Sequence, residues 1–256
     1  MPNEKINELL NLSISIITKI GNELTYYESQ SKEYTFSIDH PREIKAVVDN
    51  TVEKKIIDLL APTGISILSE ESGFIQGVSS SKLYFIIDPI DGTYNYVKDL
   101  GPCAISIALW DDEFPVFGVI FNIRENKVAW GGKEIVSKYG GRRIEVSKIK
   151  DKSKASICTG FPSRYNLDSE SVMLEFWNLV SKFSKVRMIG SAAISLLNLS
   201  KGSCDVYSEK GIMIWDVAAG LAILEGSGGE ANYEKSNIKH SLNVYASNKF
   251  LSKSGL

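Results

Sequence analysis

Residues 83–91 read Leu-Tyr-Phe-Ile-Ile-Asp-Pro-Ile-Asp, an apolar run that ends on two carboxylates three positions apart. The apolar residues from Leu83 to Ile87 predict a strand buried on both faces. Pro89 predicts that ladder pairing stops there, because proline has no backbone N–H to donate. Asp88 and Asp91 would then lie together at the end of the strand, where they repel each other unless a cation lies between them. The run therefore predicts a divalent metal site at the end of a buried strand.

The composition is that of an ordinary globular protein, and it restricts the partners. The chain has 256 residues, enough for one large domain or two small ones, of which 43% are hydrophobic and 23% charged. The formal net charge of −2 predicts no general attraction to nucleic acid or to a membrane surface. No apolar run approaches ~18 residues, and the N-terminus lacks the basic and apolar blocks of a signal peptide. Three widely spaced cysteines fit reduced thiols, so we expect a cytoplasmic protein.

The first half of the chain predicts helices packed on a mostly antiparallel sheet. Helical periodicity covers Asn3 to about Glu28, and a second helical pattern opens at Pro41 and ends before Pro62. The polar stretch 29–40 between them is typical of an exposed, mobile loop. Five strands are then predicted, at 65–68, 83–87, 104–110, 116–122 and 127–130.

After Gly140 and Gly141 the pattern changes to alternating strands and helices, which predicts an α/β second half. The predicted strands are 155–159, 185–189, 205–208 and 242–246, and the predicted helices are 168–183, 192–199 and 215–224. We therefore predict an N-terminal α+β part, residues 1–140, that carries the metal site. A C-terminal α/β part, residues 141–256, would complete one compact catalytic unit.

Acidic residues recur at the ends of predicted elements. Each one alone has an ordinary interpretation, as a helix cap or a solvated turn. Together they are hard oxygen ligands without a neighbouring His or Cys, which is the chemistry that Mg²⁺ prefers. The two histidines, His40 and His240, lie beside no zinc motif or serine-nucleophile motif, so zinc and triad chemistry are disfavoured. The acidic residues are Asp49, Glu70, Glu71, Asp88, Asp91 and Asp216.

Four motifs give these residues a family context: Ser-Glu-Glu-Ser at 69–72, Asp-Pro-Ile-Asp-Gly-Thr-Tyr-Asn-Tyr at 88–96, Gly-Ser-Ala-Ala at 190–193 and Trp-Asp-Val-Ala-Ala-Gly at 215–220. In this order and spacing, over about residues 45 to 230, the chain resembles the inositol monophosphatases. The resemblance implies the layered α/β/α/β/α sandwich of the sugar phosphatases, which is shared with fructose 1,6-bisphosphatases. It also implies Mg²⁺-dependent hydrolysis of a small phosphate monoester, inhibition by Li⁺ and a homodimer.

The resemblance also implies roles for individual residues. Two Mg²⁺ ions, or three, would be held by Glu70, Asp88, the backbone carbonyl of Ile90, Asp91 and Asp216, with Asp88 bridging two of them. Thr93 would orient the attacking water with support from Asp49, for which a helix-surface charge stays the alternative. Glu71 would assist from beside these ligands or help to place a further ion.

The substrate contacts divide between phosphate and alcohol. Gly92 and Thr93 precede a short helical stretch, so their N–H groups are expected to face the phosphate. Gly190, Ser191 and Ala192 repeat this arrangement before a second helix, where an ordinary helix cap is the alternative interpretation of Ser191. In the family, that segment lines the pocket for the alcohol part of the substrate.

Three further residues concern the choice of substrate. Glu209 matches a family position that hydrogen-bonds ring hydroxyls. Arg164 or Arg187 could grip a second phosphate, which would suit fructose 1,6-bisphosphate, whereas a pocket without such an arginine would suit inositol 1-phosphate. Solvated arginines, or a pair with Asp168, stay open as alternatives.

The stretch between the first two helices departs from the family pattern. It is bulky and aromatic where relatives often carry a small-residue loop with a basic side chain, which leaves the third ion open. Asp39 could approach the site from this stretch or cap the following helix. A 3'-phosphoadenosine 5'-phosphate phosphatase, or a catalytically silent regulator that binds sugar phosphates, is the alternative function.

Overall fold

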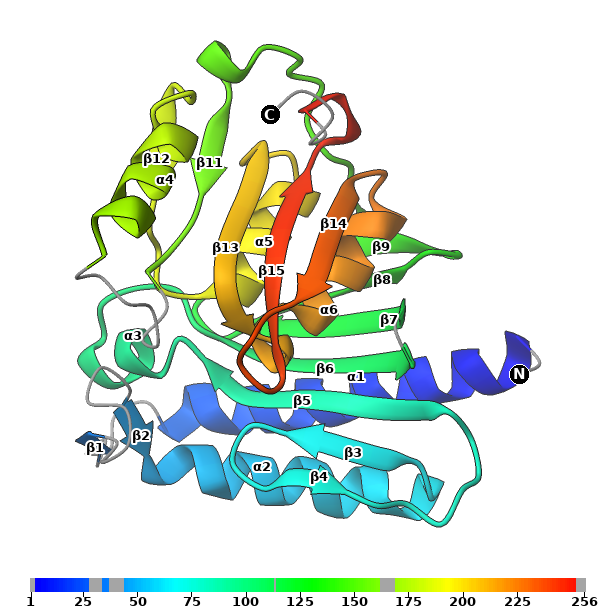
Figure 1. The fold of residues 1–256 in the computed structure, drawn as a ribbon. Helices are drawn as coiled ribbons and strands as arrows, with labels where there is room; N and C mark the ends of the chain where they lie inside the picture. The colour runs from blue at the N-terminus through cyan, green and yellow to red at the C-terminus, as the bar shows by residue number, and fades with distance from the viewer. Residues whose placement is uncertain (1–2, 28–33, 37–43, 113, 162–168, 252–256) are drawn as a thin grey trace.

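The computed structural model describes residues 3–27, 34–36, 44–112, 114–161 and 169–251, and the description below is confined to them. Two large sheets and the helices around them form five layers (Figure 1). Helices α1 (Asn3–Tyr27) and α2 (Val47–Leu60) cover one face of the first sheet. Helices α5 (Ala192–Ser200) and α6 (Ile214–Gly226) lie between the two sheets, and α4 (Glu170–Val180) packs on the far face of the second. This confirms the predicted α/β/α/β/α class.

The first sheet has eight strands in the order β10-β9-β8-β7-β6-β5-β3-β4. All neighbours are antiparallel except β3 and β5, which run parallel and bring Ser69 level with Ile87. The predicted mostly antiparallel sheet is therefore confirmed, and its one parallel pair lies next to the edge strand β4. Its strands are β3 (Ser66–Ser69), β4 (Gly73–Ile75), β5 (Leu83–Asp91), β6 (Ala104–Asp111), β7 (Phe114–Asn122), β8 (Lys127–Gly132), β9 (Ile135–Tyr139) and β10 (Arg142–Arg143).

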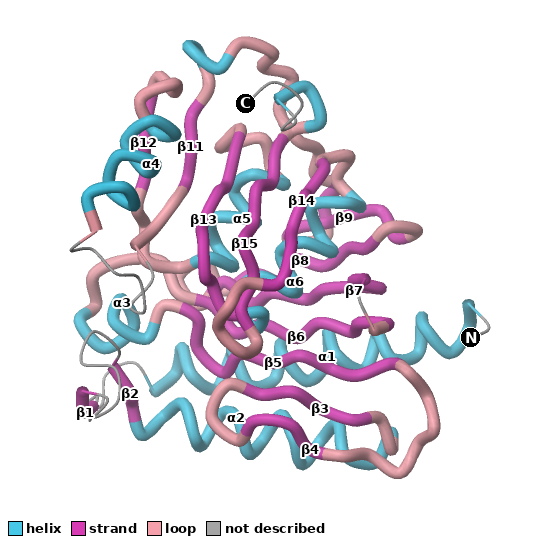
Figure 2. The backbone as a smooth tube through the Cα atoms, in the orientation of Figure 1, coloured by secondary structure: helices cyan, strands magenta, loops and turns pink. Residues whose placement is uncertain are grey.

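The second sheet has five strands in the order β12-β11-β13-β15-β14, and its strands run across those of the first sheet (Figure 2). Helix α6 packs against both sheets. It approaches β7 so closely that a Cβ on Gly118 would overlap the carbonyl of Ala219. The strands are β11 (Ser156–Cys158), β12 (Lys185–Arg187), β13 (Val206–Met213), β14 (Glu230–Lys235) and β15 (Ser241–Ser247).

Three expectations about local structure were wrong. Pairing does not stop at Pro89: β5 continues to Asp91, which pairs with Ala104, because the register shifts between Asp88 and Asp91 and the strand bypasses the missing donor. The second helix begins at Val47 rather than Pro41, because β2 (Ile44–Ala46) pairs with β1 (Tyr34–Phe36) directly before it. The same pair places a strand inside the predicted loop 29–40.

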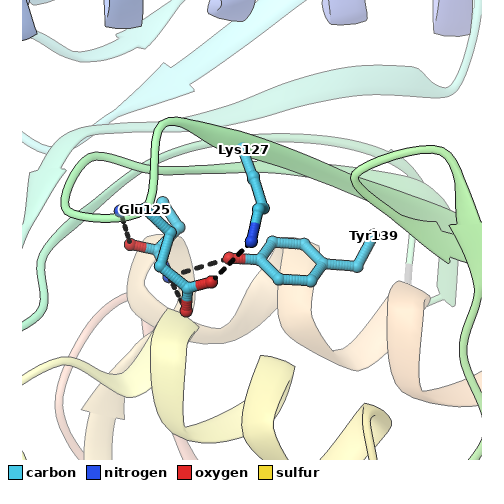
Figure 3. A network of polar contacts seen from close by, with 4 residues as sticks. Glu125, Lys127 and Tyr139 are labelled. Atoms are coloured by element: carbon cyan, nitrogen blue, oxygen red, sulfur yellow. Dashed lines mark hydrogen bonds and ion pairs between the residues drawn. The ribbon is translucent and has the colours of Figure 1, made fainter.

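A polar network fixes the turn between β7 and β8 (Figure 3). The side-chain amide of Asn122 donates to the hydroxyl of Tyr139 at 3.1 Å, and the ammonium of Lys127 donates to Glu125 at 3.2 Å. Burial of the Tyr139 phenol and its contact with Glu125 raise the pKa of the phenol.

Within the described residues, no helix is long and apolar enough to cross a membrane.

Candidate active site

Three carboxylates from two elements meet where β5 ends and α6 begins. Asp88 and Asp91 lie at the end of β5, and Asp216 lies in the first turn of α6. Each offers an oxygen within 4.8 Å of the others. The start of α6 is fixed there because the hydroxyl of Ser106, on β6, donates to the carbonyl of Trp215 at 3.2 Å. The predicted pairing of these two motifs is therefore observed in space.

Asp88 lies at the centre of this cluster without a hydrogen-bond donor. It is 1% exposed, and neither carboxylate oxygen has a hydrogen-bond partner among the described residues. Burial raises its pKa well above the usual range, and the charges of Glu70, Asp91 and Asp216 raise it further. A buried carboxylate that faces only other carboxylates requires a proton or a cation. The donor set, which is all carboxylate oxygen, fits a hard divalent cation.

Asp91 differs from Asp88 because the N-terminus of α5 surrounds it with donors. Its oxygens accept from the hydroxyl of Ser191 and from the backbone N–H groups of Ala192 at 3.2 Å and Ala193 at 3.0 Å. Burial raises its pKa to about 6, against the lowering effect of these three donors. Ser191 also caps α5 by accepting from the N–H of Ile194 at 3.2 Å. The segment predicted to line the substrate pocket therefore also holds a predicted metal ligand.

Glu70 lies in the turn that follows β3, close enough to Asp88 for its charge to raise the pKa of that residue. The turn's position follows from the parallel pairing of Ser69 with Ile87, which puts Glu70 beside the end of β5. The residue is exposed, yet lost hydration and the charges of Asp49 and Glu71 raise its pKa to about 8. Asp49 is buried on α2 rather than on the helix surface, which disfavours the surface-charge alternative.

Sequence reasoning missed Glu53, which holds this turn. Its carboxylate is 3% exposed and accepts hydrogen bonds from Ser69, from the N–H groups of Glu71 and Ser72, and from the Ser72 hydroxyl. A signal was available in the helical spacing. Glu53 follows Asp49 by four residues, on the same face of α2 as Val52 and Ile56, which are buried.

Gly92 and Thr93 lie where β5 passes into α3 (Thr93–Lys98). Gly92 has a φ of +82°, and a Cβ there would lie 2.9 Å from the carbonyl oxygen of Gly190. The two predicted substrate segments are therefore in direct contact. The hydroxyl of Thr93 donates to the carbonyl of Ile90 at 3.0 Å, next to the acidic cluster.

Asn95 is a second residue that the sequence did not single out. Its side-chain amide donates to the carbonyls of Ile189 at 2.7 Å and Pro102 at 2.9 Å. These bonds tie α3 to the segment before α5. The available signal was its place inside the motif at 88–96, which contains a polar residue between two tyrosines.

Glu209 lies on β13 beside a pocket of about 470 Å³. Burial raises its pKa to about 7, although the hydroxyl of Tyr207, which donates to it at 2.9 Å, lowers the value. A Cβ on Gly160 would lie 3.0 Å from the Glu209 carboxylate, so this glycine leaves the approach open. Phe161 lines the same pocket and packs against Phe176 with ring centroids 4.4 Å apart.

Of the two arginines, Arg187 lies within the described residues and is not among those that line the pocket beside Glu209. Arg187 is exposed on β12, the edge strand of the second sheet, and donates to the carbonyl of Val186 at 2.9 Å. Arg164, Asp168 and Asp39 lie outside the described residues.

Comparisons with known proteins find relatives along nearly the whole chain. A sequence model of the inositol monophosphatase family matches residues 5–251. The chain is 30% identical to a fructose-1,6-bisphosphatase/inositol-1-monophosphatase from Aquifex aeolicus over 73% of this chain and 71% of that protein. It is 28% identical to the Nus factor SuhB of Pasteurella multocida, over 88% and 84% of the two chains.

Solved structures give the same picture of the fold. The extragenic suppressor protein SuhB of Bartonella henselae superposes with a TM-score of 0.84 at 26% identity, covering 95% of each chain. An inositol monophosphatase from Anabaena superposes with a TM-score of 0.78 at 26% identity, covering 95% of this chain and 92% of that one.

Proposed function

Because the chain belongs to the inositol monophosphatase family, we propose that it is a Mg²⁺-dependent phosphatase acting on a phosphate monoester of a sugar or cyclitol. The observation that carries the proposal is the buried Asp88 carboxylate, which faces Asp91 and Asp216 without a donor among the described residues. The favoured substrates are inositol 1-phosphate, fructose 1,6-bisphosphate or both.

The residues that would hold Mg²⁺ are Glu70, Asp88, Asp91, Asp216 and the carbonyl of Ile90. This carbonyl accepts from Thr93, but a carbonyl oxygen has a second lone pair that can face a cation. When bound, Mg²⁺ would lower the pKa of the attacking water and stabilise negative charge on the phosphate. The number of ions, two or three, is part of the proposal.

The other site residues orient the reactants. Thr93, whose hydroxyl is directed by Ile90, would accept a hydrogen bond from the attacking water, with the buried Asp49 stabilising the same water. The N–H groups of Gly92 and Thr93, at the start of α3, would face the substrate phosphate, while the absent Cβ of Gly92 leaves room for the carbonyl of Gly190. Glu209 would accept hydrogen bonds from the hydroxyl groups of the alcohol part.

Phosphate release tests the proposal directly. Wild-type protein with saturating Mg²⁺ is assayed with inositol 1-phosphate, fructose 1,6-bisphosphate and 3'-phosphoadenosine 5'-phosphate, and Asp88→Asn is the inactive control. We expect turnover with one or both of the first two. Preference for the third would identify an adenosine phosphate phosphatase. Absence of release from all three would favour a non-catalytic role. Several relatives carry the name Nus factor, which is compatible with such a role.

Self-association is a separate part of the proposal. A homodimer is expected from the family, and sedimentation velocity checks it. A single species near the 28.3 kDa of the chain would refute it.

A further inference from the structure

Glu53 is a buried carboxylate whose hydrogen bonds all go to one turn. One oxygen accepts from the Ser69 hydroxyl, from the N–H of Glu71 at 3.1 Å and from the N–H of Ser72 at 3.0 Å. The other accepts from the Ser72 hydroxyl at 2.6 Å. All these donors are uncharged, so Glu53 has the pattern of a charged anchor for backbone and hydroxyl groups.

The anchored turn is the one that presents Glu70. Ser69 is fully buried at the end of β3, and Glu70 follows it directly. Glu53 therefore grips the chain on both sides of Glu70, at the preceding hydroxyl and at the two following N–H groups. Loss of these bonds would leave the buried Ser69 hydroxyl unpaired and free the turn to rotate.

Helix α2 supplies this anchor in register with Asp49. The two residues are four apart, so they lie on one face of the helix, and both are buried. Asp49 is close enough to Glu70 for its charge to raise the pKa of that residue, whereas Glu53 binds the backbone beside it. Two residues on one face of α2 therefore act on the same turn: the charge of Asp49 acts on Glu70, and Glu53 accepts hydrogen bonds from the residues beside it.

We propose that Glu53 is a positioning residue of the metal centre: it fixes the 69–72 turn so that Glu70 faces Asp88, and it thereby sets the affinity for the cation. This inference rests on the proposed function, because it requires that Glu70 is a ligand. It adds a residue whose two carboxylate oxygens both accept hydrogen bonds from the turn.

The experiment measures metal binding without substrate. Mn²⁺, used as the probe, is titrated into wild type, Glu53→Ala and Glu53→Gln, and the free ion is followed by electron paramagnetic resonance. Removing an outer partner of a metal ligand typically weakens affinity about 10- to 100-fold, and we expect a loss of this size for Glu53→Ala. Glu53→Gln is expected to stay within about threefold of wild type, since its carbonyl oxygen can keep the three bonds and Ser72 can turn to accept from the new amide.

Asp205 offers a matched control for a purely structural effect. It is also buried and also accepts from serine and backbone groups, namely Ser147 and the N–H and hydroxyl of Ser156 at 2.7 and 2.9 Å. Asp205→Ala should lower stability without changing the Mn²⁺ dissociation constant.

A second readout is phosphate release. Glu53→Ala should raise the Mg²⁺ concentration that gives the half-maximal rate, while much of kcat returns at saturating Mg²⁺.

Each outcome has a distinct meaning. If wild type binds Mn²⁺ and a folded Glu53→Ala binds it within twofold as tightly, the role of Glu53 is refuted while the proposed function stands. If wild type binds no Mn²⁺, the metal site itself fails, and the inference with it. If Glu53→Ala does not fold, Ser72→Ala decides, because it removes one of the four bonds at an exposed residue, and unchanged affinity there refutes the proposal.

Discussion

Replacing Asp88 with Asn should stabilise the metal-free protein while it destroys the metal site. The carboxylate of Asp88 is buried without a donor among the described residues, and one of its oxygens lies within 4.8 Å of an oxygen of Asp91 and of Asp216. At 4.8 Å and an effective dielectric constant of ~20, two ionised carboxylates repel each other by about 3.5 kcal/mol. Asparagine removes this charge and offers an N–H₂ group that both neighbours can accept.

The size of the effect depends on pH in a defined direction. The folded-state pKa of Asp88 is raised, so the group favours folding fully below its unfolded pKa of about 4 and loses that contribution as the pH rises through the raised value. Proton uptake by the cluster relieves part of the repulsion, so we expect Asp88→Asn to gain about 2 to 4 kcal/mol at pH 8. The gain should shrink toward zero near pH 4.

Urea unfolding in EDTA, at pH 8 and pH 4.5, measures this difference. Asp205→Asn is the matched control: its carboxylate accepts three hydrogen bonds, so the same exchange should cost about 1 to 3 kcal/mol. Added Mg²⁺ should stabilise wild type and leave Asp88→Asn unchanged. A metal-free Asp88→Asn protein that is no more stable than wild type at pH 8 would refute the reasoning.

Three further predictions concern the contact between Gly92 and Gly190 and the reaction. Gly228→Ala should cost about 1 kcal/mol in urea unfolding from its positive φ alone, whereas Gly92→Ala should cost about 3 kcal/mol, since its methyl group would also lie 2.9 Å from the oxygen of Gly190. Thr93→Ala should lower kcat for phosphate release by about 10²-fold or more, while Thr93→Ser, which keeps the hydroxyl, should stay within about tenfold. Glu209, with a pKa raised to about 7, should give a KM for inositol 1-phosphate that falls as the pH rises from 6 to 8 and the carboxylate ionises; Glu209→Gln should weaken that dependence.

Most of the elements that the sequence predicted bury enough side chains to leave an apolar run or a periodic apolar pattern. The residues of β5 are buried along almost the whole strand, and the continuous apolar run from Leu83 to Ile87 predicts this burial. Strand β14 reads Glu-Ala-Asn-Tyr-Glu-Lys and was missed, because an edge strand with one open face needs no apolar run. The edge strands β4 and β10, of three and two residues, are too short to give a pattern. Strand β9 was also missed, although its burial alternates along the strand, because one of its inward residues is the polar Ser137.

The candidate site divides along a similar line. Asp88, Asp91 and Asp216 were predicted as a group from their motifs, and the structure brings them together. Glu53 was missed because one acidic residue on a helix is usually a solvated charge. Only its place on the buried face, four residues after Asp49, distinguishes it, and that face is certain only once the packing of α2 is known.

The contact between Gly92 and Gly190 explains why the same motifs say little about the substrate. Asp91 already uses the Ala192 and Ser191 donors, and Gly92 meets Gly190 at a distance that leaves no room for a side chain. These residues are committed to joining the end of β5 to the start of α5, whatever the alcohol part of the substrate is. We therefore expect substrate choice to be set beside this contact, around Glu209, where the adjoining pocket has side chains that none of the four motifs specifies.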